Sequence, residues 1–178
     1  MHGIIFTSFR HFVTSRAGSD AAERVWANEP TYLITRSYPD EAFLRLFDTA
    51  CRELGEDPDE LLRAFGVFAG ERTFVLLYPS YFAQASGPRP FLLGLEERIH
   101  ELVRATVPEA APPRLVIEPL DDDGVRVTYT SPRRLCVLLE GLLLGTARHF
   151  GREVAMEQTS CMHRGGDACV VEARFDPP

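Results

Sequence analysis

Three polar side chains gather where a predicted strand meets a predicted helix: Tyr129, Ser131 and Arg133. Alternate side chains of an extended segment share a face, so Tyr129 and Ser131 project together. Pro132 favours an extended Ser131 and can take the first helical position, which predicts Ser131 as the N-cap and Arg133 in the first turn. Two hydroxyls, a guanidinium and a helix N-terminus all favour anionic oxygens. The junction therefore predicts a site for an anionic ligand, with an ordinary Ser-Pro helix cap as the simpler interpretation.

His100 is a second candidate, because it flanks the apolar stripe of a helix predicted over residues 90–107. A histidine at the edge of an apolar face is usually a boundary residue of the core. The alternative is a neutral imidazole offered to a metal from a hydrophobic surface.

Cysteines supply a third candidate site. Cys161 and His163 are two residues apart, so they share a face of a predicted strand, and Cys169 follows the turn-forming segment 164–167. Cys136 lies in the preceding predicted helix and completes a Cys₃His set that suits tetrahedral zinc. The spacing matches none of the tight zinc-finger patterns, and buried cysteines also serve as small core residues. Zinc binding and core packing are both open interpretations.

The composition limits the class of protein. A chain of 178 residues suits one domain, and 45% hydrophobic with 25% charged residues is typical of a soluble globular protein. A net charge of −7 argues against nucleic acid as a partner. No apolar run of membrane-spanning length and no signal peptide are visible, so we expect no membrane insertion, a cytoplasmic location and reduced cysteines. No nucleophile–base pair, phosphate loop or paired-carboxylate site stands out, so no enzyme is predicted.

The elements that position these residues follow from periodicity. Apolar residues at helical spacing predict helices over residues 3–17, 20–27, 40–50, 57–79 and 90–107, with the fourth interrupted at Gly66 and Gly70. Period-2 alternation predicts strands over 114–120 and 125–131, joined by a turn at 121–124. A long helix over 132–150 and a second hairpin over 153–175 follow. Helices followed by strands predict an α+β fold with an antiparallel sheet.

The order and spacing of these features resemble one family, the haem nitric oxide/oxygen-binding (H-NOX) domains of the bacterial stand-alone type, related to the haem domain of soluble guanylate cyclase. His100 and Tyr129 are 29 residues apart, and "MHGIIFTSF", "SYPDEAF", "AFG" and "YPSYF" are similar to blocks of that family. The resemblance implies a single domain over residues 1–178. It implies a helical distal lobe at about 1–60, and a proximal lobe at about 61–178 with a four-stranded antiparallel sheet and a long helix.

The same resemblance implies haem b as the cofactor and His100 as the proximal ligand of its iron. The Tyr-x-Ser-x-Arg residues would bind the haem propionates, while Ile5 and Pro113 would press on the porphyrin. The residue chemistry is compatible, because a dicarboxylate with an apolar body needs donors at one rim and an apolar slot elsewhere.

The choice of gas depends on one position. Oxygen-binding members of the family carry a distal tyrosine on the helix after the motif, where this chain has Leu138. An apolar pocket offers bound dioxygen no hydrogen bond, so we predict nitric oxide as the ligand. Tyr32, Tyr78 and Tyr81 are other candidate donors.

Signalling is expected to be mechanical: NO binding opposite His100 would weaken the iron–histidine bond and release its helix. The resemblance implies a separate partner chain, such as a histidine kinase or a cyclic-di-GMP enzyme. One alternative is a zinc-thiolate redox sensor on the same fold, because some H-NOX proteins resemble this cysteine arrangement. The other is a vinyl-reductase-like small-molecule binding module, whose "C…GGDxC" hairpin is similar to residues 161–169.

Overall fold

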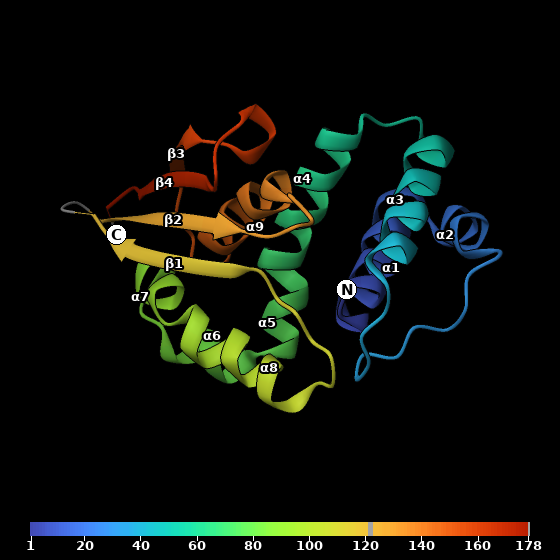
Figure 1. The fold of residues 1–178 in the computed structure, drawn as a ribbon, viewed down its shortest axis with the longest axis horizontal. Helices are drawn as coiled ribbons and strands as arrows, with labels where there is room; N and C mark the ends of the chain where they lie inside the picture. The colour runs from blue at the N-terminus through green and yellow to red at the C-terminus, as the bar shows by residue number, and fades with distance from the viewer. Residues whose placement is uncertain (121–122, 178) are drawn as a thin grey trace.

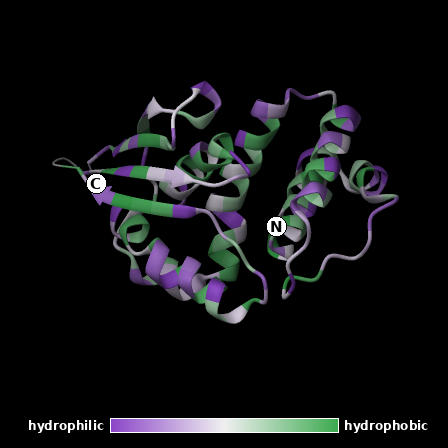
Figure 2. Ribbon diagram, viewed as in Figure 1, coloured by the Kyte–Doolittle hydropathy of each residue, from purple (hydrophilic) through white to green (hydrophobic). Residues whose placement is uncertain are grey.

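The structure is a computed structural model that describes residues 1–120 and 123–177. Helices built from the first part of the chain stand on one side of the molecule, and a sheet lies on the other (Figure 1). Hydrophilic and hydrophobic residues alternate around the helices, as expected for helices with one buried face (Figure 2). No helix among the described residues is long and apolar enough to cross a membrane.

The helical segments are, in chain order, α1 (Gly3–Ala17), α2 (Ser19–Trp26), α3 (Asp40–Leu54), α4 (Pro58–Phe68), the π-helix η1 (Ala69–Thr73), α5 (Phe74–Leu77), α6 (Pro79–Gln84), α7 (Pro88–Leu93), the π-helix η2 (Glu96–His100), α8 (Glu101–Thr106), α9 (Cys136–His149) and the 3₁₀ turn η3 (Met162–Arg164).

The strands are β1 (Arg114–Pro119), β2 (Gly124–Thr130), β3 (Val154–Ser160) and β4 (Cys169–Phe175). They form one sheet in the order β1-β2-β4-β3, and every neighbouring pair is antiparallel. Alternate residues of β2 and β4 are buried, so one face of the sheet packs on the core. The predicted α+β class and four-stranded antiparallel sheet are confirmed. The predicted turn at 121–124 lies partly outside the described residues.

An aromatic core joins the N-terminal helices. Phe9 of α1 is fully buried and contacts the rings of Phe43, Phe47 and Phe65 from α3 and α4. The core includes further residues of α4 and η1, just beyond the predicted lobe boundary at residue 60. Ile5, which is also on α1, is partly buried at the edge of this core.

Glycines bring α4 and η1 unusually close to α9. Gly66 and Gly70 were expected to interrupt a helix, but the segment stays helical from Pro58 to Leu77 with a π-helical turn inside it. A Cβ built on Gly141 of α9 would lie 2.2 Å from the carbonyl oxygen of Arg63. The glycines are therefore contact points between backbones, and they fix the position of the α9 side chains.

Three predicted elements have different bounds in the structure, and each of them carries or adjoins candidate residues. The helix predicted from residue 132 begins at Cys136, because residues 131–134 form a turn closed by the Arg134 N–H on the Ser131 carbonyl, in which Arg134 has φ +52°. The strand predicted through His163 ends at Ser160, after a register irregularity, and η3 follows. The helix predicted over 90–107 begins at Pro88 and is divided at Gly94.

Candidate functional site

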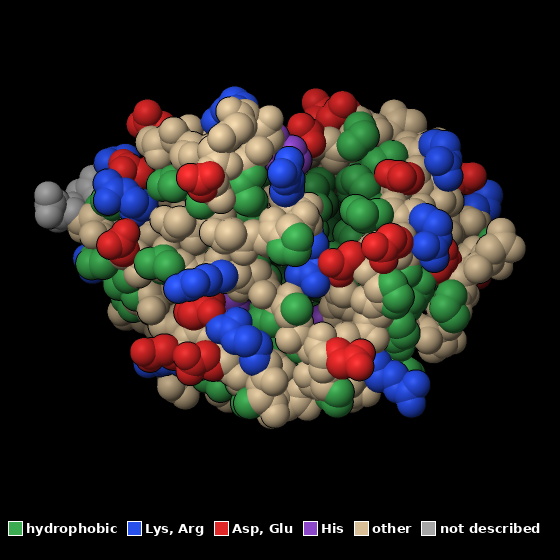
Figure 3. Space-filling view, in the orientation of Figure 1, with side chains coloured by type: hydrophobic (Ala, Val, Ile, Leu, Met, Phe, Trp, Pro, Cys, Tyr) green, Lys and Arg blue, Asp and Glu red, His purple; other side chains and the backbone are tan. Residues whose placement is uncertain are grey.

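A large apolar cavity lies between the N-terminal helix, the sheet and α9. Its empty space, mouth included, is about 1360 Å³. Figure 3 shows hydrophobic side chains gathered in the hollow between the two sides of the molecule. The cavity is lined by all seven residues predicted to contact haem, which come from five separate parts of the chain: Ile5, His100, Pro113, Tyr129, Ser131, Arg133 and Leu138. The structure therefore brings the whole predicted set to one place.

His100 is the last residue of the π-helix η2, a kind of turn that is frequent at functional sites. Its side chain is 17% exposed, and its Nδ1 lies 2.8 Å from Oε2 of Glu96. Burial lowers the pKa of His100 and outweighs the opposite effect of Glu96. The imidazole is therefore neutral near pH 7, which is the form that can bind a metal.

Tyr129 and Ser131 are buried at the end of β2, as alternation predicted. Ser131 does not cap a helix as expected: its Oγ accepts the N–H of Arg133 at 3.2 Å within the turn. The hydroxyl of Tyr129 accepts the N–H of Leu135 at 3.1 Å, just ahead of α9. Burial raises the pKa of Tyr129, so its hydroxyl keeps a proton that can be donated to an anion.

Arg133 connects three segments around the mouth of the cavity. Its Nη1 donates to the carbonyl oxygen of Ala111 at 2.6 Å, which ties down the Pro112-Pro113 segment. Its Nε lies 2.8 Å from Oδ2 of Asp40 in α3. Burial opposes the ionisation of Asp40, but hydrogen bonds from the Met1 amino group and from Arg133 outweigh it and lower the pKa of this carboxyl.

The cavity and its rim fit a haem group. Arg133 uses Nη1 for Ala111 and Nε for Asp40, and a guanidinium has five N–H donors, so it keeps donors that can bind a carboxylate. Tyr129 supplies a second donor beside it, while the walls are predominantly leucine, isoleucine, valine and aromatic side chains. An apolar slot with cationic and hydroxyl donors at one rim matches a planar apolar cofactor that ends in carboxylates.

The cavity contains few other polar groups. Leu138, the position that the family resemblance implies for a distal tyrosine, lines it, and so does Tyr78, whose pKa is raised by burial. Tyr32 lies elsewhere: it stacks on Phe6 and its hydroxyl is bonded to Glu29. Tyr81 does not line the cavity either, so of the three candidate distal tyrosines Tyr32, Tyr78 and Tyr81, Tyr78 alone lines it.

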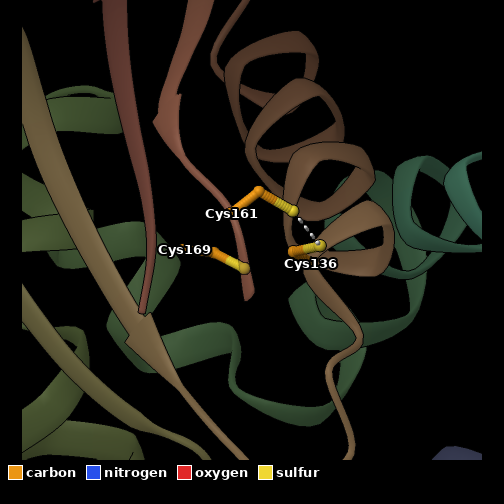
Figure 4. A group of neighbouring side chains, drawn as sticks. All are labelled: Cys136, Cys161 and Cys169. Carbon is orange, nitrogen blue, oxygen red and sulfur yellow. Dashed lines mark hydrogen bonds between the residues drawn. The ribbon is translucent and has the colours of Figure 1, made fainter. Parts of the chain in front are cut away.

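The cysteines form a separate buried group beside the cavity. The sulfur atoms of Cys136, Cys161 and Cys169 all lie within 4.8 Å of one another (Figure 4). Burial and the neighbouring thiols raise the pKa of Cys136 to about 12. Burial also opposes ionisation of Cys161, but hydrogen bonds from the backbone N–H groups of the η3 turn and from the other two thiols outweigh it and lower its pKa.

The structure does not bring His163 into this group. It is exposed on η3, and its Nε2 lies 2.7 Å from the carbonyl oxygen of Arg134. The predicted Cys₃His set depended on a strand that continued through residue 163. Because β3 ends at Ser160 and η3 follows, the His163 imidazole lies at the Arg134 carbonyl and is not part of the thiol group.

Three residues that lie in the cavity wall or contact its candidate residues were not predicted from the sequence: His2, Asp40 and Glu96. Asp40 and Arg133 are far apart in the chain, so no local pattern could pair them. His2 lines the cavity, and its Nδ1 accepts the N–H of Ile4 at 3.0 Å as an N-cap. Glu96 had a readable signal, because a residue four positions before a helical histidine lies on the same face.

Comparisons with known proteins agree with this geometry. A family model described as Haem-NO-binding matches residues 2–158. Soluble guanylate cyclase 89Da of Drosophila melanogaster is 25% identical over 161 residues, which cover 84% of this chain and 23% of that protein. The chain thus spans about a quarter of the length of this curated relative.

The fold is shared with solved H-NOX structures. An H-NOX protein from S. oneidensis in the Fe(II)NO state has a TM-score of 0.90 at 24% identity, over 99% of this chain and 100% of that one. An H-NOX domain from Shewanella oneidensis in the Fe(II)CO state has a TM-score of 0.89 at 25% identity, over 100% of both chains. A mutant H-NOX from T. Tengcongensis has a TM-score of 0.86 at 23% identity, over 100% and 99%. With a family model that matches nearly its whole length, the chain belongs to the haem-NO-binding family of H-NOX gas-sensor domains.

Proposed function

We propose that this domain binds haem b in the cavity, senses nitric oxide and passes the signal to a separate protein. The observation that carries the proposal is the convergence of His100, the Tyr-x-Ser-x-Arg residues, Ile5, Pro113 and Leu138 on one cavity. Bound haem would supply an iron centre with one face open to a diatomic gas.

The protein side chains would then have distinct roles. His100 offers Nε2 to the iron, because its Nδ1 is held by Glu96. Tyr129 and Arg133 donate to the propionates, and Arg133 keeps its contacts to Asp40 and Ala111, so the cofactor is linked to α3 and to the Pro-rich segment. Ile5 and Pro113 press on the porphyrin from the cavity wall.

We propose that the readout is the helix that carries His100. A change in the bond between His100 and iron would act directly on η2 and α8, because His100 lies at their junction. Leu102 of α8 is 41% exposed, so this helix presents an apolar side chain at the surface. A partner such as a histidine kinase or a cyclic-di-GMP enzyme could read a shift of this surface. The cavity has no catalytic role in this proposal.

The gas preference can be tested by absorption spectroscopy. We expect the ferrous protein to form an NO complex and no stable oxygen complex in air, because Leu138 offers bound dioxygen no hydrogen bond. A stable oxygen complex would contradict the prediction. If a stable oxygen complex forms in wild type but not in Tyr78→Phe, Tyr78 is the hydrogen-bond donor. If the complex also forms in Tyr78→Phe, His2 is the next candidate donor.

The cysteine group supports a second candidate function, a zinc-thiolate site that responds to oxidation. Three sulfur atoms within 4.8 Å of one another supply three of the four ligands that tetrahedral zinc takes. Such a site would connect β4 and the 161–169 loop to the start of α9. Oxidation of the thiols would release this connection.

Metal analysis tests this second candidate. We expect about one zinc per chain in protein purified without chelators, and loss of that zinc in Cys161→Ser and Cys169→Ser. Cys51→Ser is the matched control, because Cys51 lies on α3 outside the group. Absence of zinc from the wild type, or equal loss in Cys51→Ser, would argue against the site.

A further inference from the structure

Glu96 connects two side chains on the helix that carries His100. One carboxylate oxygen, Oε2, lies 2.8 Å from Nδ1 of His100. The other, Oε1, forms an ion pair with Nη2 of Arg104. The three residues occupy successive turns of η2 and α8, so their spacing is set by the helix itself.

The direction of the first hydrogen bond follows from the donor inventory. A carboxylate has no proton to give, so Nδ1 of His100 is the donor. A neutral imidazole carries one N–H, and Nε2 is therefore the nitrogen with a free lone pair. Glu96 thus selects the tautomer that His100 needs to bind iron from the cavity wall.

The bond also affects the strength of the ligand. A carboxylate that accepts the second N–H of a ligand histidine raises its basicity and fixes the orientation of its ring. The Glu96 side chain is 26% exposed, so solvent only partly weakens this effect. Arg104 acts in the opposite direction, because its ion pair withdraws charge from the same carboxylate, although its side chain is 40% exposed.

We propose that Glu96 is a positioning residue for the haem iron, which holds His100 in the ligand tautomer and strengthens its bond to iron, with Arg104 as the side chain that limits this strength. The inference rests on the proposed function, because it takes His100 as the iron ligand. It adds a determinant that lies outside the cavity and outside the Tyr-x-Ser-x-Arg motif.

The test measures the iron–histidine stretching frequency by resonance Raman spectroscopy of the ferrous, haem-loaded chain. Glu96→Gln keeps an acceptor but removes the charge, and Glu96→Leu removes both. We expect the frequency to fall from wild type to Gln and further to Leu. Haem affinity is expected to fall by about 10- to 100-fold in Leu, as is typical when the outer partner of a metal ligand is lost. Arg104→Met is expected to raise the frequency.

The opposite frequency shifts expected for Glu96→Gln and Arg104→Met separate the proposed role from a mere contribution of the ion pair to helix stability. Glu96→Gln and Arg104→Met both remove the same ion pair, so a contribution to helix stability alone would shift both variants in the same direction. Glu97→Gln is the matched control, because Glu97 is the exposed neighbour of Glu96 and should leave the frequency unchanged.

The outcomes distinguish failure of the proposed haem function from failure of the role of Glu96 alone. A chain that binds no haem, or a band that survives His100→Ala, would overturn the proposed function. A haem-loaded chain whose band depends on His100 but is the same in wild type, Glu96→Leu and Arg104→Met would overturn the role of Glu96 alone. A shift of equal sign in Glu96→Gln and Arg104→Met would overturn it as well.

Discussion

Replacing His100 by alanine is expected to abolish axial coordination of haem and to remove most haem binding. The imidazole is the protein group placed to reach iron from the η2 side of the cavity, and its Nε2 is kept unprotonated by Glu96. Loss of the ligand itself should weaken haem binding by more than the roughly 10- to 100-fold typical of an outer partner. The measurement is a haem titration followed by absorption at the Soret band.

Free imidazole supplies an internal check on this result. Added to His100→Ala, it should restore part of the Soret band, because the cavity left by the side chain can accept it. His11→Ala is the matched control, since His11 is exposed on α1 and does not line the cavity. Unchanged haem affinity and an unchanged spectrum in His100→Ala would show that another residue binds the iron.

The second large effect is expected at the contact between α4 and α9. In Gly141→Ala the new Cβ would lie 2.2 Å from the carbonyl oxygen of Arg63, and backbone at this distance cannot yield by a side-chain rotation. We expect a loss of about 1–3 kcal/mol in the free energy of unfolding. This loss should appear even though alanine favours a helix over glycine by about 1 kcal/mol.

Urea denaturation of the haem-free and haem-loaded chains measures this effect. Gly87→Ala is the control, because Gly87 has an extended backbone with φ 168° and open space around its Cβ position. A Gly141→Ala variant as stable as wild type would show that the two helices can separate at low cost. Haem affinity should fall together with stability, since Leu138 and Leu142 of α9 line the cavity.

Much of the fold was predictable because its signals are local. Period-2 alternation predicted the strands, and apolar spacing with glycine or proline at the ends predicted most helices. The start of α9 was not predictable in this way. Arg134 adopts a left-handed backbone that non-glycine residues rarely take, so nothing in "SPRR" marks the turn that delays the helix.

The candidate site was predictable to the extent that its residues share a motif or a spacing. Tyr129 and Ser131 followed from strand alternation, and His100 from its distance to them together with the family resemblance. The link between Arg133 and Asp40 joins the turn after β2 to α3 across the fold, and only the folded chain shows it. His163 lies apart from the three thiols, because β3 ends at Ser160 and the predicted strand does not reach residue 163.

The most direct test of the account is the absorption spectrum of the purified chain after incubation with haem and gel filtration. We predict a Soret band that co-elutes with the protein at about one haem per chain and that shifts when NO is added to the ferrous form. A colourless chain that leaves all haem behind on the column would contradict the assignment of the cavity.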